Sequence, residues 1–140
     1  MLEKSEILKR FNERCKDTLM ETLEIEYVDV GDDFVVAQMP VNSRVHQPYG
    51  ILHGGATAAL AESVGSLASS YFVDNDRFVI KGIELSENHV KSVKEGMVTA
   101  TATIVHKGRS THLWEIKVVN TSGDLISIAK ITNIVLEKRA

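Results

Sequence analysis

The segment that most constrains the fold is residues 55–72, GATAALAESVGSLASSYF, which is rich in Ala, Ser and Gly and carries one charged side chain, Glu62. This composition predicts a helix, and a helix that is apolar almost all the way round is typical of a buried element. Its small side chains allow neighbouring strands to approach it closely. The segment therefore predicts a central helix that the rest of the chain surrounds.

Six other segments have the pattern of β-strands. Apolar residues alternate with Thr in residues 96–106, and Trp114, Ile116 and Val118 alternate with Leu113, Glu115 and Lys117 in the next segment. Such alternation indicates antiparallel strands with one covered face. Gly31-Asp32-Asp33 and Thr121-Ser122-Gly123-Asp124 have the composition of hairpin turns. The expected strands are residues 24–30, 34–41, 78–88, 96–106, 111–120 and 125–136.

Apolar residues at mostly helical spacing predict a further helix over residues 2 to about 20. The expected order is thus one helix, two strands, a second helix and four strands. We predict an α+β fold in which an antiparallel β-sheet wraps around a long central helix, with an extra N-terminal helix. A length of 140 residues suits one domain, residues 1–140.

The charge and cysteine content narrow the class of partner. The formal net charge is −3, which argues against nucleic acid because binding a phosphate backbone requires a basic excess. No stretch approaches the apolar length of a membrane helix, and charges interrupt the first eleven residues, unlike a signal peptide. Cys15 is the only cysteine, which excludes an intrachain disulfide. We expect a soluble, cytoplasmic protein with no nucleic acid and no membrane partner.

The tripeptide His53-Gly54-Gly55 stands immediately before the central helix. Glycines let the backbone approach a ligand closely, and the free N–H groups of a first helical turn favour negative charge. Such a turn suits an oxyanion hole for a carbonyl group under attack. The alternative is an ordinary helix start after a glycine-rich turn.

Glu62 is the only charged residue between His53 and Asp74. A buried carboxylate is costly unless it is paired or functional. Ser66, four residues later, lies on the same helical face and could hold the carboxylate by a hydrogen bond. The alternative is a structural carboxylate at a helix end or a dimer seam, paired with an arginine.

Other motifs are weak or missing. Ala61-Glu62-Ser63-Val64-Gly65 resembles a nucleophile elbow but lacks its first glycine and lies within a helix. The chain has no phosphate-binding or dinucleotide-binding glycine motif. Its histidines lack metal-ligand spacing, so we expect no metal site. These histidines are His46, His53, His89, His106 and His112.

The order of these motifs resembles the hotdog thioesterases of the 4-hydroxybenzoyl-CoA type, which use a catalytic glutamate. The resemblance covers most of the chain after about residue 25. Within that family the sequence is most similar to the 1,4-dihydroxy-2-naphthoyl-CoA hydrolases and the enterobactin-pathway proofreading thioesterases. It rests on residues 47–55 (QPYGILHGG), 59–66 (ALAESVGS), 82–84 (GIE), 88–92 (NHVKS), 95–96, 106–109 (HKGR) and 114–116 (WEI).

The resemblance implies a role for each matching residue of the reaction centre. Glu62 corresponds to the nucleophile or general base, and the backbone N–H of Gly54 corresponds to the oxyanion donor. Gln47 and His53 correspond to the residues that align and polarise the thioester carbonyl. Ser66 corresponds to the hydroxyl residue that orients the hydrolytic water.

The resemblance also implies the substrate contacts and the assembly. The order of basic and hydroxyl residues in the segment 107–111 departs from the pattern of these hydrolases and thioesterases, so the CoA phosphate contacts stay open. CoA is part of the acyl-CoA substrate, and no separate cofactor is expected. The family implies a homodimer with shared sites, a homotetramer built as a dimer of dimers, and a role in menaquinone biosynthesis. The implied acyl, pantetheine and nucleotide contacts are Gly82, His89, Val90, Lys91, Ser92, His106, Lys107, Gly108, Arg109, Ser110 and Thr111.

Helix geometry independently favours a shared site. Gly54 and Glu62 are eight residues apart, which corresponds to about 12 Å along a helix axis. A thioester under attack needs both groups within about 3 Å. Two antiparallel helices from two chains would bring Glu62 of one to Gly54 of the other.

Two alternatives to hydrolysis remain open. A hotdog hydratase or dehydratase would act on an enoyl-CoA, although the histidine and acid arrangement of those enzymes is missing here. A non-catalytic acyl-CoA sensor would bind the thioester without releasing CoA, but it would have no use for Glu62 beside the thioester bond.

Overall fold

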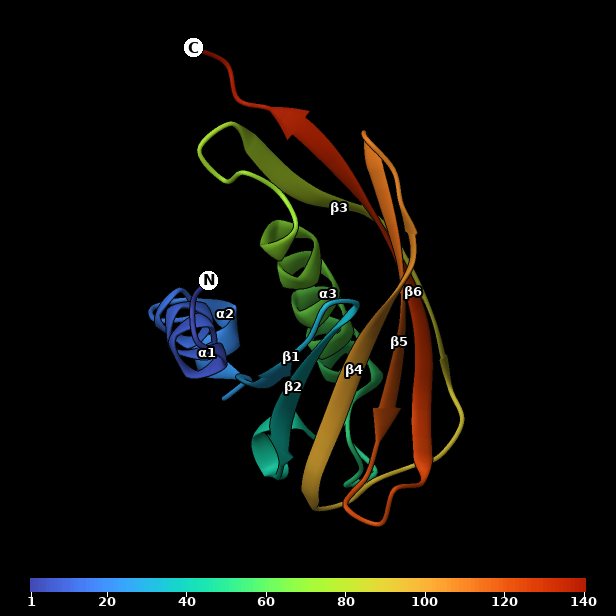
Figure 1. The fold of residues 1–140 in the computed structure, drawn as a ribbon. Coiled ribbons are helices and arrows are strands. Elements are labelled where there is room, and N and C mark those ends of the chain that lie inside the picture. The colour runs from blue at the N-terminus through green and yellow to red at the C-terminus, as the bar shows by residue number, and fades with distance from the viewer.

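One six-stranded antiparallel sheet curves around the helix α3, Gly54–Tyr71, in the computed structural model, which describes residues 1–140 (Figure 1). The strand order across the sheet is β1-β2-β4-β5-β6-β3. This arrangement confirms the predicted α+β fold with a sheet around a central helix. The strands are β1 Glu26–Val30, β2 Phe34–Val41, β3 Phe78–His89, β4 Gly96–Lys107, β5 Thr111–Val119 and β6 Leu125–Glu137.

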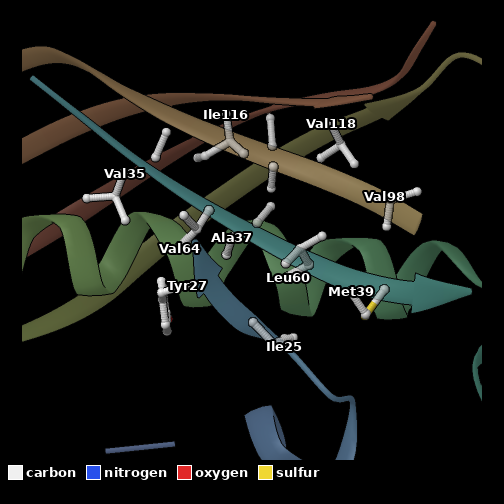
Figure 2. Packing of buried hydrophobic residues seen from close by; sticks show 14 of the residues in the cluster. Ile25, Tyr27, Val35, Ala37, Met39, Leu60, Val64, Val98, Ile116 and Val118 are labelled. Carbon is white, nitrogen blue, oxygen red and sulfur yellow. The ribbon is translucent and has the colours of Figure 1, made fainter. Parts of the chain in front are cut away.

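The core lies between α3 and the concave face of the sheet (Figure 2). Leu60 and Val64 on α3 are fully buried against Ala37 of β2 and Ile116 of β5. Small side chains on β2 and β4 allow this close approach, as the composition of α3 had suggested. The helix is not buried all round, however. Glu62 is exposed, so the prediction of a buried carboxylate is wrong for the single chain.

The predicted N-terminal helix is two helices, α1 Lys4–Glu13 and α2 Leu19–Thr22. The break has a backbone cause, because Asp17 adopts a φ of 61°, which a helix does not accommodate. The Thr18 hydroxyl then donates to the Cys15 carbonyl at 2.5 Å, which closes the turn. Figure 1 shows α1 and α2 on one side of α3, with the sheet on the other. No helix has both the length and the apolar character needed to cross a membrane.

A β-bulge interrupts β3 beside α3. Gly82 pairs with Asn133 of β6 and Glu84 pairs with Thr132, which leaves Ile83 as the extra residue. Bulges of this kind redirect side chains and are common next to active sites. This one places the glycine where its missing side chain leaves room for α3.

Helix α3 packs closely against the sheet at Gly65. A Cβ atom at this position would lie 2.5 Å from Cγ2 of Ile131. We expect Gly65→Ala to lower the free energy of unfolding, because overpacking costs about 1–3 kcal/mol and outweighs the helix-propensity gain of about 1 kcal/mol. Thermal unfolding measures this change. Ser66→Ala, one residue away on the less covered face, should unfold at or slightly above the wild-type temperature. An equal loss in both variants would contradict the packing argument.

Candidate active site

Glu62 lines the larger of two cavities that matter for chemistry, which we name the glutamate cavity. Its volume is about 450 Å³, and it lies between α3, the start of β3 and the N-terminal helices. Three aromatic side chains contribute to its wall. The lining residues are Phe11, Arg14, Cys15, Met20, Tyr27, Glu62, Ser63, Ser66, Leu67, Ser70, Asn75, Phe78, Val79, Ile80 and Lys138.

The Glu62 carboxylate is unpaired within the chain. None of the ion pairs includes it, so the alternative of a structural glutamate bound to an arginine finds no partner here. Its Oε1 lies over Gly82, 3.0 Å from where a Cβ atom of that glycine would be. Ser66 shares the cavity, but no hydrogen bond joins it to Glu62. The carboxylate is therefore accessible to a reactant.

A second cavity, which we name the amide cavity, lies at the other end of the site, around the start of α3. Its volume is about 350 Å³. It brings together several of the predicted site residues from the loop, the helix start and the end of β3. They are Gln47, Gly54, His89, Val90, Lys91 and Ser92, with Ile51, Leu52, Thr57, Val93 and Ile126 completing the lining.

The backbone N–H of Gly54 has no hydrogen-bond partner. The N–H groups of the neighbouring residues all have acceptors. That of His53 donates to the Val45 carbonyl, and those of Ala56 and Thr57 donate to the His53 carbonyl. The N–H of Gly55 donates to Nδ1 of His53 at 2.7 Å. One free donor at a helix N-terminus is the arrangement that an oxyanion requires.

Gln47 and His53 face different spaces. The side-chain carbonyl of Gln47 accepts from the N–H of Tyr49, which leaves its NH₂ group free in the amide cavity. Because Nδ1 of His53 accepts from Gly55, the neutral ring carries its proton on Nε2. The His53 ring lines a separate hollow with Leu19 and Leu23 of the N-terminal region, and not the amide cavity.

The segments predicted to contact CoA lie at opposite ends of the sheet. His89 pairs with Ser127, whereas Thr111 pairs with Ile134, seven residues further along β6. At about 3.4 Å per residue, the two segments are more than 20 Å apart. Lys91 and Lys94 therefore lie far from the Lys107–Arg109 turn within one chain.

The lysines of these segments also have partners. Lys91 forms an ion pair with Asp124 at 2.6 Å, and this contact lowers the pKa of the aspartate. The ammonium of Lys107 lies 4.5 Å from the ring centre of Phe72. Arg109 and Ser110 are exposed at the turn. His89 packs its ring against Gly54, where a Cβ atom would lie 2.8 Å from Nε2.

A buried polar cluster behind the glutamate cavity was missed by the sequence analysis. The hydroxyl of Ser69 accepts from Nε1 of Trp114 at 2.8 Å and from Nδ2 of Asn133 at 2.7 Å. With both lone pairs used, its proton donates to Nδ1 of His112, 3.0 Å away. Strand parity could have revealed the cluster, because His112 shares a face with Trp114, and Asn133 shares one with Ile131.

His112 makes the stability of the fold sensitive to pH. Burial, reinforced by the charge of Lys107, lowers the pKa of its imidazole from the ordinary value. Below about pH 6.5 the unfolded chain binds a proton that the folded chain excludes, so stability falls as pH decreases. We expect the unfolding temperature to drop between about pH 7.5 and 5.5, and His112→Gln to remove much of that drop. An identical pH dependence in both proteins would show that His112 has no part in it.

Comparisons with known proteins identify the family of the chain. The model of the thioesterase superfamily matches residues 49–127. The chain is 40% identical to the proofreading thioesterase EntH of Cronobacter turicensis, over 92% of this chain and 93% of that protein. It is 41% identical to the 1,4-dihydroxy-2-naphthoyl-CoA hydrolase of Listeria monocytogenes, over 86% of this chain and 98% of that protein.

A solved structure gives the same result for the fold. The crystal structure of a mutant thioesterase from Pseudomonas aeruginosa superposes with a TM-score of 0.92 at 39% identity, covering 94% of each chain. The sheet around a single long helix is the hotdog fold. With this fold and these relatives, the chain belongs to the thioesterase superfamily of hotdog enzymes.

Proposed function

We propose that the protein hydrolyses an aromatic acyl-CoA thioester to the free acid and CoA, with Glu62 as nucleophile or general base. The observation that carries the proposal is the unpaired, accessible carboxylate of Glu62 on a helix that has no other charged residue. A carboxylate of this kind can attack a thioester carbonyl or activate a water molecule. The proposal would group the chain with the glutamate-dependent thioesterases of the superfamily.

Each reaction centre is shared between two chains in this proposal. Within one chain, Glu62 and Ser66 line the glutamate cavity, whereas Gln47 and Gly54 line the amide cavity. Antiparallel packing of two α3 helices would join the glutamate cavity of one chain to the amide cavity of the other. The face of α3 that carries Glu62 is open in the single chain, as such packing requires.

The chemical roles follow from the donors and acceptors of each half-site. The free N–H of Gly54 and the NH₂ of Gln47 would hold the thioester oxygen and stabilise its negative charge. Glu62 would attack the carbonyl carbon or take a proton from the attacking water. The C–S bond then breaks and CoA leaves as the thiol. Ser66 would orient the water, and His53 would reach the site through its Nε2–H after a change of rotamer.

The nucleotide of CoA would lie against the turn of residues 106–111. Lys107 and Arg109 are the cations of this turn, and phosphates prefer such donors. The turn lies near the C-terminal end of α3, away from the amide cavity of its own chain. The chain that provides Glu62 would therefore also bind the CoA phosphates, while His89–Ser92 of the other would contact the pantetheine.

An aromatic acyl group suits the glutamate cavity, where Phe11, Tyr27 and Phe78 line the wall. The relative named for hydrolysis of 1,4-dihydroxy-2-naphthoyl-CoA favours the same class. We expect benzoyl-CoA, hydroxybenzoyl-CoA and 1,4-dihydroxy-2-naphthoyl-CoA to exceed acetyl-CoA by about 10-fold or more in kcat/KM. Release of CoA thiol, followed with a thiol reagent over this panel, measures the ratio. A clear preference for acetyl-CoA or palmitoyl-CoA would overturn the aromatic assignment, and no thiol release from any member would overturn hydrolysis itself.

A further inference from the structure

Asn133 of β6 carries a buried oxygen without a hydrogen-bond partner. The residue is fully buried, and its Oδ1 is one of two buried side-chain atoms that lack a partner, the other being Oε2 of Glu87. Burial raises the pKa of Glu87, which favours its neutral acid form. The amide of Asn133 has no protonation state that would remove the cost of leaving an acceptor unpaired.

The orientation of the Asn133 amide is fixed by its donors. Its Nδ2 donates to the Gly65 carbonyl at 3.1 Å and to the Ser69 hydroxyl at 2.7 Å. A backbone carbonyl only accepts, so the NH₂ group must face α3 and the oxygen must face the other way. Ser69 is held in turn by Trp114 and His112. The bond to the Gly65 carbonyl therefore fixes the direction of Oδ1, and Ser69 adds a second bond to the same NH₂ group.

Oδ1 of Asn133 and the carboxylate of Glu62 both lie beside Gly82. The point above Gly82 where a Cβ atom would lie is 3.6 Å from Oδ1 of Asn133 and 3.0 Å from Oε1 of Glu62. The two oxygens thus border the same space and are no further apart than the sum of these distances. They cannot hydrogen-bond while Glu62 is ionised, because both only accept. Only a Glu62 side chain that holds a proton could donate to this oxygen.

We propose that Asn133 is a positioning residue whose Oδ1 accepts a hydrogen bond from Glu62 after that carboxylate has taken a proton from the attacking water. The inference rests on the proposed function and selects the general-base role. The water oxygen forms the new C–O bond as its proton passes to Glu62. The C–S bond then breaks, and the thiolate receives the proton from Glu62. The acid and the CoA thiol are the only products.

Steady-state kinetics with benzoyl-CoA, followed by thiol release, test this role. Asn133→Leu keeps the size of the side chain and removes the acceptor. We expect kcat to fall about 10-fold to 100-fold, with KM within about threefold of wild type, because the hydrogen bond exists only after proton transfer. Ser69→Ala is the matched control, since it removes one hydrogen bond of the cluster but keeps the bond from Nδ2 of Asn133 to the Gly65 carbonyl, which sets the direction of Oδ1. Its unfolding temperature should fall, while kcat stays within about threefold.

A double variant that combines Asn133→Leu with Glu62→Gln distinguishes a positioning role of Asn133 from a purely structural one. If Asn133 acts through Glu62, adding Asn133→Leu to Glu62→Gln lowers the residual rate no further. A further loss in that background, an equal loss of kcat in Ser69→Ala, or near-normal kcat in Asn133→Leu would each overturn the inference. Asn133→Ser, which is too short to reach Glu62, replaces the leucine variant if that protein does not fold. Normal turnover of Glu62→Gln alone would instead overturn the proposed function.

Discussion

Glu62→Gln is expected to lower turnover about 10³-fold or more, the scale seen when a nucleophile or a general base is removed. The amide keeps the size of the side chain but neither attacks a carbonyl nor takes a proton from water. Binding of CoA should stay close to the wild-type affinity, because the nucleotide would lie at the turn of residues 106–111. Thiol release measures the first quantity, and isothermal calorimetry with CoA measures the second.

Glu26→Gln provides a matched control for this substitution. Glu26 is an exposed glutamate at the start of β1, and it takes part in no ion pair. Its variant carries the same change of charge, so its turnover should equal that of the wild type. If Glu62→Gln retained near-normal turnover, the carboxylate would have no chemical role and the site would have to be sought elsewhere.

Most of the fold could be predicted from local patterns. The small-residue segment before Tyr71 defined α3 to within one residue, and alternation along residues 96–106 and 111–120 defined β4 and β5. The prediction of one continuous N-terminal helix was wrong because the helix is broken by the left-handed backbone conformation of Asp17. The helical spacing of apolar residues gives no signal for such a break. Periodicity reports which face is apolar, and not where the backbone turns.

The candidate site was harder to predict because it depends on contacts between distant segments. An open helix face that another chain would cover has the same sequence pattern as a face covered by its own sheet, so Glu62 was expected to be buried. The grouping of Gln47 with Gly54 and His89 follows from three segments that meet only in the folded chain. Asn133 was missed for the same reason, since its unpaired oxygen is visible only beside Gly82.

The separation of Glu62 from Gln47 in one chain makes mixing of two inactive variants the most direct test of the account. In the proposed homodimer, Glu62→Ala and Gln47→Ala would each damage both sites, so each protein alone should be nearly inactive. In a mixed dimer, one shared site would combine the two intact halves and the other would combine both damaged halves. Free exchange of subunits at equal concentrations yields mixed dimers for half of the population.

Thiol release from the exchanged mixture, compared with the unmixed variants, is the decisive measurement. The shared-site account predicts that activity returns to about a quarter of the wild-type value, because half of the dimers each regain one of two sites. The recovery should follow the rate of subunit exchange, and it should be absent when two preparations of the same variant are mixed. A mixture that stays as inactive as its components, although exchange is complete, would contradict a reaction centre built from two chains.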